Sequence, residues 1–163
     1  SAQWPGKRWS ASRYRVVIQE LLPKTKSTFI IFGGPADRFC DDIGKGFPPH
    51  RILNTQGKLS IAESAALISA CQLIVANDTG LMHMADALGV PSLVILGPTS
   101  KAMGCLPYHP KHRIAERHDL WCRPCSKNGQ APCIRGRRHC LDIEPQQVFN
   151  MAVQMAHTIG LNA

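Results

Sequence analysis

The sequence contains no apolar run near the roughly 20 residues that a membrane-spanning helix needs. Its first residues also lack the charged start and apolar core of a signal peptide. The first residue is not Met, so we expect the true beginning of the protein to be missing. Aromatic residues make up 6% of the chain and do not alternate with basic ones. This disfavours a nucleic-acid platform, in which bases stack on aromatic side chains.

The balance of apolar and charged residues indicates one globular domain over residues 1–163. Hydrophobic residues make up 44% and charged residues 18%, which is typical of a folded domain with a real core. The net charge of +8 points to an anionic partner such as a lipid headgroup or phosphorylated glycolipid, although a solvated face would also explain it. Basic residues crowd the last third: Lys111, Arg113, Arg117, Arg123, Lys127, Arg135, Arg137 and Arg138.

Residues 74–99 predict a strand, a helix and a second strand. An apolar β-branched run ends at Asn77, a helical segment follows and stops near Gly89, and a second apolar run reaches Leu96. Two parallel strands joined in this way place their carboxyl ends at one sheet edge, where open α/β sheets bind ligands. Further strands and helices alternate along the chain, which predicts a Rossmann-like, doubly wound parallel sheet.

The turn after the first of these strands is a candidate anion site. Asp78 and Thr79 can cap the helix, and Gly80 lets the backbone approach a bound group. The free amides of the first turn would face a ligand with the helix dipole behind them. His83 shares a face with Thr79, and Gly97–Thr99 adds a second loop, so the pair can cradle a diphosphate. The alternative is that these residues only cap a helix.

These motifs resemble those of the ADP-heptose:lipopolysaccharide heptosyltransferases, which are two-domain GT-B glycosyltransferases. The resemblance rests on the segments 77–85, 87–91, 97–99 and 6–9, and extends from about Trp4 to the terminal helix. It implies that the chain is the C-terminal, donor-binding half of such an enzyme. The whole enzyme would transfer heptose from ADP-heptose to the lipopolysaccharide inner core, with inversion at the sugar.

The resemblance also implies partners and a location. The general base belongs to the family's N-terminal domain, so the present chain is expected to bind ADP-sugar without turnover. No cofactor is required by the transfer. The expected location is the cytoplasm of a Gram-negative bacterium, with peripheral contact to the anionic inner membrane as an option. No nucleic-acid partner is expected.

Several site residues follow from the resemblance. Lys7 matches a lysine that contacts the nucleotide-sugar diphosphate, where it stabilises the leaving group. Lys58 and Leu59 fall in the segment that resembles the lining of the adenine pocket, although a capped helix without ligand contact would explain them equally well. Family members often carry an acidic residue near the position of Asp37, and that residue meets the donor sugar or the ribose. Gly33 ends an apolar strand, so a close-approach loop is expected there.

Local signals predict the remaining elements. Ser10 or Ser12 can cap a helix that Pro23 ends, and Ser60 with Glu63 forms a capping box for a helix from Ile61 to about Ala70. Strands are expected at 28–32, 52–54 and 112–117, a short helix at 39–43, and a terminal helix at about 145–159.

Four of the seven cysteines lie in a basic segment at about 121–140. Cys122, Cys125, Cys133 and Cys140 have the spacing C-x2-C-x7-C-x6-C. Four thiolates are a typical ligand set for tetrahedral zinc, and the same set is chemically compatible with iron. Disulfides and free packed thiols are the other two interpretations.

Two other functions fit parts of the pattern. A nucleotide-sugar transferase or epimerase of similar fold would prefer another donor, such as a UDP-sugar. A binding module would use the cysteine-rich segment as a metal-dependent surface and leave the Asp78–Gly80 turn structural.

Overall fold

The computed structural model describes residues 2–104 and 106–160, and its elements alternate between helices and parallel strands. One short 3-10 helix lies near the start of the chain, a second lies before the cysteine-rich segment, and a third lies at the end of that segment. The elements in chain order are η1 (Pro5–Lys7), α1 (Ala11–Leu21), β1 (Phe29–Ile31), α2 (Phe39–Gly44), β2 (Ile52–Asn54), α3 (Ile61–Ser69), β3 (Ile74–Asn77), α4 (Gly80–Ala87), β4 (Ser92–Ile95), η2 (Lys101–Met103), β5 (His112–Ala115), η3 (His139–Leu141) and α5 (Pro145–Thr158).

Every strand pair in the described part of the chain is parallel, as the sequence predicts. β3 pairs with β4 in the register Asn77 to Ile95, and β4 pairs with β5 in the register Ile95 to Ala115. β1 pairs only with β2, so the strands form two sheets, in the orders β1-β2 and β3-β4-β5, where one doubly wound sheet was expected. Residues of both β1 and β3 line a mainly apolar cavity of about 620 Å³.

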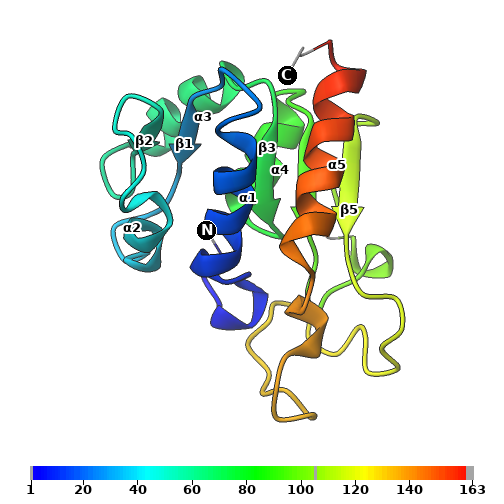
Figure 1. Cartoon of the computed structure of the whole chain (residues 1–163). Coiled ribbons are helices and arrows are strands. Elements are labelled where there is room, and N and C mark those ends of the chain that lie inside the picture. Colours follow the sequence, from blue (N-terminus) through cyan, green and yellow to red (C-terminus); the bar gives the residue numbers. More distant parts are fainter. Residues whose placement is uncertain (1, 105, 161–163) are drawn as a thin grey trace.

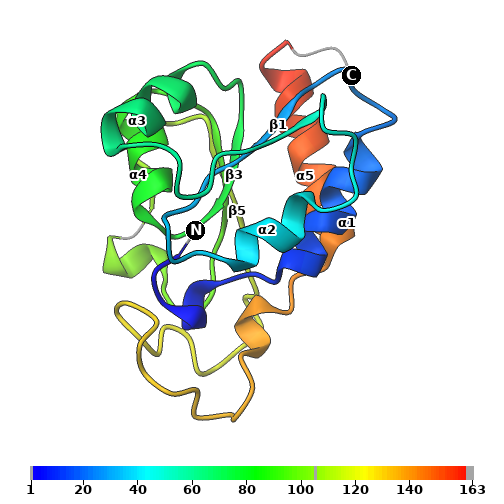
Figure 2. The same ribbon diagram turned by 90° about the vertical axis from the view of Figure 1, so that its left-hand side faces the viewer.

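Helices cover both faces of the three-stranded sheet. α1 and α5 pack together on one face, and α3 and α4 pack together on the other (Figure 1; Figure 2). Residues of β4 are the centre of the core, because Leu93, Val94 and Ile95 are fully buried. α5 covers them with Val148 and Ala152. A continuous apolar strand is the pattern expected of a strand that is buried on both faces.

The helix starts follow from local capping chemistry. Ser10 accepts a hydrogen bond from the Arg13 amide and begins α1. Ser60 and Glu63 form the reciprocal capping box that the sequence predicts, and α3 begins at Ile61, directly after Ser60. Pro145 stands at the first position of α5, where its missing N–H costs no hydrogen bond.

In the described residues, no helix combines the length and the apolar character that crossing a membrane requires.

Candidate functional site

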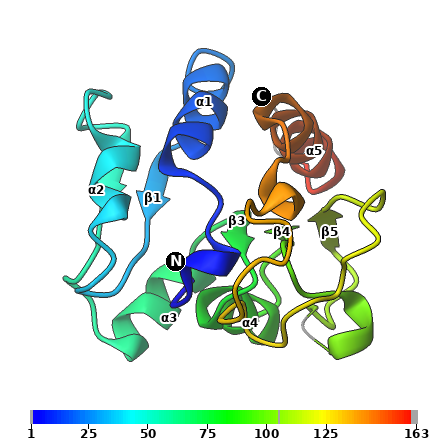
Figure 3. The same ribbon diagram turned by 90° about the horizontal axis from the view of Figure 1, so that it is seen from below.

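Three loops converge where β3 and β4 end: the N-terminal loop, the turn into α4 and the loop after β4 (Figure 3). The Lys7 ammonium Nζ lies 2.7 Å from Asp78 Oδ2, across 71 residues of sequence. The Thr99 hydroxyl donates to the same carboxylate oxygen at 3.0 Å. The loops that the sequence analysis placed at one sheet edge therefore meet around one carboxylate.

Burial makes this pairing necessary. Asp78 is 5% exposed, and an unpaired charge at that depth would be costly. Lys7 supplies the opposite charge and Thr99 a hydrogen bond, so both stabilise the ionised carboxylate. The expectation that Asp78 caps α4 is not met, because its carboxylate is used by Lys7 and Thr99.

The cap of α4 is Thr79 instead. Its hydroxyl accepts from the Met82 amide at 3.4 Å, and its carbonyl accepts from His83 N at 3.2 Å. The preceding amides in the first turn have no acceptor within the helix, because a helix leaves its first donors unpaired. Gly80 is exposed, and a Cβ added to it would meet no other part of the described protein within 4 Å.

His83 stands at the edge of the same group. Its Nε2 lies 4.0 Å from Asp78 Oδ1, which is beyond hydrogen-bond range. Its side chain is 47% exposed, so the imidazole can reach a ligand from the solvent side.

The side chain of Asn77 links the N-terminal loop, α1 and β4, a role that the sequence patterns did not predict. Its Oδ1 accepts from the Trp9 amide at 3.3 Å and from the Tyr14 hydroxyl at 2.9 Å. Its Nδ2 donates to the Ile95 carbonyl at 3.3 Å. Burial, and then the nearby Cys40 thiol, raises the pKa of Tyr14 far above its usual value, so the hydroxyl remains a donor. The signal in the sequence was a polar residue at the end of a buried strand.

The loop after β1 brings Gly33 and Asp37 together. Asp37 Oδ2 accepts from the Gly34 amide at 2.7 Å, and its Oδ1 lies 3.6 Å from Arg8, the neighbour of Lys7. A Cβ added to Gly33 would lie 3.0 Å from Cys40 Sγ, so the backbone of Gly33 closely approaches other atoms of the protein. Asp37 thus lies beside the N-terminal loop.

Lys58 and Leu59 lie apart from this arrangement. Lys58 Nζ donates to the Asn54 carbonyl at 2.9 Å, and Leu59 is half-buried before the capping box. In the described ranges, neither residue makes a hydrogen bond or an ion pair to Lys7 or Asp78. Their expected contact with a base stays a prediction.

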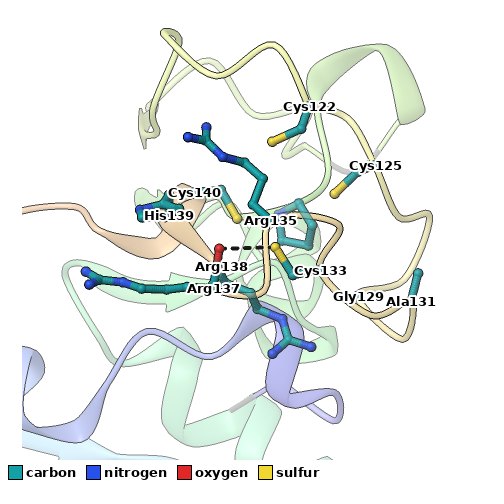
Figure 4. A pocket seen from close by; sticks show the side chains of 11 residues that line it. Cys122, Cys125, Gly129, Ala131, Cys133, Arg135, Arg137, Arg138, His139 and Cys140 are labelled. Carbon is teal, nitrogen blue, oxygen red and sulfur yellow. Dashed lines mark hydrogen bonds between the residues drawn. The ribbon is translucent and has the colours of Figure 1, made fainter.

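The four cysteines of the segment 121–140 surround one small cavity of about 20 Å³, which is room for one water molecule or ion (Figure 4). The thiols are free, and Cys133 Sγ donates to the Arg137 carbonyl at 3.1 Å. Burial first, and neighbouring thiols next, raise the pKa of Cys125.

As placed, these thiols do not form a metal-binding set. Over residues 2–104 and 106–160, no group of three or more His, Cys, Asp or Glu side chains is positioned to hold a metal ion. The side chains therefore do not fit a bound ion in this arrangement.

Comparison with known proteins decides the family. Residues 1–133 match glycosyltransferase family 9 (heptosyltransferase). The chain belongs to this family. The resemblance seen in the sequence motifs is thereby confirmed.

Curated relatives of this glycosyltransferase family 9 chain are heptosyltransferases. It is 31% identical over 100 residues to lipopolysaccharide heptosyltransferase 2 of Escherichia coli K12, covering 59% of this chain and 28% of that protein. It is 28% identical over 151 residues to lipooligosaccharide heptosyltransferase 2 of Campylobacter jejuni, covering 90% of this chain and 46% of that protein. The chain thus spans less than half the length of these relatives.

Solved structures agree with the GT-B assignment. The structure of E. coli ADP-heptose LPS heptosyltransferase II superposes with a TM-score of 0.79 at 26% identity, over 97% of this chain and 45% of that one. The glycosyltransferase family 9 protein from Veillonella parvula gives a TM-score of 0.76 at 23% identity, over 97% and 44%, and supports the fold. So does the dodecameric iron-containing heptosyltransferase TibC, with a TM-score of 0.67 at 16% identity, over 98% and 44%.

Proposed function

We propose that this chain is the donor-binding part of a heptosyltransferase that moves heptose from ADP-heptose to the lipopolysaccharide inner core. The observation that carries the proposal is the convergence of Lys7, Thr99 and the start of α4 on Asp78. A diphosphate at this edge would meet a lysine ammonium and the unpaired amides of Thr79 and Gly80. The names of the relatives supply the donor and the acceptor.

The proposed chemistry is stabilisation of a leaving group. When an acceptor hydroxyl attacks the anomeric carbon, the bond to the diphosphate breaks and negative charge grows on the departing ADP. Lys7 and the amides at the start of α4 would neutralise that charge. The base that takes the proton of the acceptor is proposed to lie in the N-terminal domain of the whole protein, so this chain alone would bind the donor without transferring it.

The proposed roles of the other site residues follow from their positions. His83 would approach the donor from the exposed side, and Asp37, beside Arg8, would meet a sugar hydroxyl. Asp78 would hold Lys7 in place. Lys58 and Leu59 stay proposed contacts of the adenine.

The acceptor and the membrane surface are proposed partners of the basic last third. Three of its eight cations form ion pairs: Arg117 with Asp119, Arg123 with Glu116 and Arg137 with Asp142. Exposed cations such as Lys127 and Arg135 carry no such pair among the described residues, and they would face phosphates of the glycolipid or an anionic inner membrane. The proposed location is therefore the cytoplasmic side of that membrane.

Calorimetry with ADP-heptose, ADP and UDP tests the proposal. We expect the adenine compounds to bind, UDP to bind much less, and Lys7→Ala to weaken ADP binding several-fold. Lys45→Ala, which removes an exposed lysine elsewhere, should bind as the unaltered chain does. Equal affinity of all forms for ADP would refute the role of Lys7, and a preference for UDP would refute the donor.

One further variant separates binding from folding. Lys7→Ala leaves the buried Asp78 without its counter-charge, which itself destabilises the site. In the double variant Lys7→Ala with Asp78→Asn, no charge is left unpaired. We expect its melting temperature to recover relative to Lys7→Ala while its ADP binding stays weak.

A structural ion is the second part of the proposal. TibC is iron-containing by its description, and the four thiols here surround one cavity. The thiols as they stand do not fit an ion, so we propose that zinc or iron, when it binds, would draw them together for stability, without a role in transfer. Metal analysis of the purified chain should then find one ion per chain, whereas four freely titratable thiols and no metal would contradict it.

A further inference from the structure

The cysteine-rich segment 121–140 packs directly against the N-terminal loop that carries Lys7. A Cβ added to Gly6 would lie 2.1 Å from the Gly129 carbonyl oxygen, and a Cβ added to Gly129 would lie 2.7 Å from Lys7 Cγ. Both distances are far below van der Waals contact. The two backbones therefore touch at a place where neither can carry a side chain.

The same segment also holds the loop after β4. Arg123 is 7% exposed, and its Nε donates to the Gly97 carbonyl at 2.6 Å while one terminal nitrogen donates to the Thr99 carbonyl at 2.9 Å. That nitrogen also donates to Glu116 Oε2 at 2.7 Å, and the other one donates to the Arg117 carbonyl. The planar guanidinium of arginine can donate to all these acceptors at once, because its N–H groups form a rigid fork. A lysine ammonium does not have this geometry.

Both contacts involve a residue that donates to the same oxygen of Asp78. Gly129 bounds the path of the Lys7 side chain, whose ammonium pairs with Asp78. Arg123 fixes the backbone of Thr99, whose hydroxyl donates to Asp78. A third link, the Cys125 amide donating to the Pro98 carbonyl at 3.0 Å, holds the same loop.

We propose that Arg123 and Gly129 are positioning residues of the donor site: they set where Lys7 and Thr99 stand, so that the cysteine-rich segment is part of the binding machinery. This inference rests on the proposed function. It goes beyond that function because the cysteine-rich segment lies outside the nucleotide motifs. The inference gives this segment the role of orienting Lys7, which would meet the diphosphate.

Two glycines of one segment give a matched test. Gly129 and Gly136 both have positive φ, +79° and +71°, so alanine strains the backbone similarly at each. A methyl at Gly136 meets nothing within 4 Å, whereas a methyl at Gly129 overlaps Lys7. We expect Gly129→Ala to weaken ADP binding at least fivefold by calorimetry and Gly136→Ala to leave it within twofold. The melting temperature should also be lower in Gly129→Ala, because only its methyl overlaps another residue. Equal affinities would overturn the proposal.

A second pair of variants tests the arginine. Arg123→Lys keeps the charge and loses the fork, and we expect it to weaken ADP binding at least fivefold. Arg38→Lys makes the same change at an exposed position outside the cysteine-rich segment and should have no effect. If both variants bind as the unaltered chain does, Arg123 does not position the site.

A ligand-free measurement keeps the inference separate from the proposed function. The Lys7 side-chain signal in a lysine-¹³Cε NMR spectrum, identified by its loss in Lys7→Arg, reports on the pair with Asp78. It should shift in Gly129→Ala and stay in place in Gly136→Ala. Failure of the unaltered chain to bind ADP would refute the proposed function, whereas an unmoved Lys7 signal in Gly129→Ala would refute the positioning role by itself.

Discussion

At the scale of single residues, the site depends on polar groups that are buried and fully used. Asp78 and Asn77 are each 5% exposed, yet together they bind partners from the N-terminal loop, α1, β4 and the loop after it. A buried polar group is stable only while its partners are present, because its lost hydration must be replaced. The residues that shape the site are therefore also among those that hold the fold together.

Asn77→Ala should show this double role. The change removes the acceptor of the Trp9 amide and of the Tyr14 hydroxyl, and a donor to the Ile95 carbonyl. We expect a loss of about 1–3 kcal/mol in the free energy of unfolding. Urea denaturation measures it. Asn150→Ala, at an exposed asparagine that accepts only from exposed Gln146, should cost far less. An equal effect of the two substitutions would show that the Asn77 hydrogen bonds carry no special weight.

At the scale of elements, Asp142 ties the end of the cysteine-rich segment to α1. It accepts from Arg13 of α1 at 3.2 Å and from Arg137 at 2.7 Å. Partial burial acts to raise its pKa, but the hydrogen bonds from Arg137 and Arg13 outweigh burial and hold the pKa below its usual value. The carboxylate is therefore favoured by the folded state.

This shift makes the contribution of Asp142 depend on pH. A pKa that is lower in the folded than in the unfolded chain stabilises the fold above the unfolded value of about 3.9, and the gain is lost as the pH falls through the folded value. We expect Asp142→Asn to lower the stability at pH 7, by no more than about 1 kcal/mol at this partly exposed site. The difference should shrink below a pH of about 4, as followed by thermal unfolding.

Asp119 provides the control for that experiment. A hydrogen bond from Arg117 lowers its pKa to about 2, but the pair is exposed and joins near neighbours in the sequence. Solvent screens such a pair, and it crosslinks no elements. Asp119→Asn should therefore change the melting temperature less than Asp142→Asn at pH 7, and the reverse order would contradict the role given to Asp142.

The elements themselves were largely predictable from the sequence. The capping box at Ser60, the proline at the start of α5 and the bounds of β2 follow from residues within one or two turns of each other, and the structure confirms them. Strand ends were predicted too long: β5 stops at Ala115, because the chain then bends toward the cysteine-rich segment. Local chemistry predicts where an element begins better than where pairing stops.

At the scale of the whole molecule, prediction was limited by contacts that have no local signal. The parallel α/β architecture follows from alternating elements, and it was confirmed. The pairing of Lys7 with Asp78 and the four acceptors of Arg123 join residues that only the finished fold brings together. The separation of β1 and β3 into two sheets could not be predicted either, because the apolar pattern of each strand is compatible with one sheet or with two.

The ion pair at the heart of the site bears on which solutes can occupy it. In the ligand-free protein the charge of Lys7 is already compensated by Asp78, so a lone chloride or phosphate ion gains little attraction there. Only a solute that also contacts the helix amides and further side chains gains enough interaction energy to compete with Asp78 for the Lys7 ammonium. On the proposed function, we therefore expect the site to select against abundant small anions before any base or sugar is recognised.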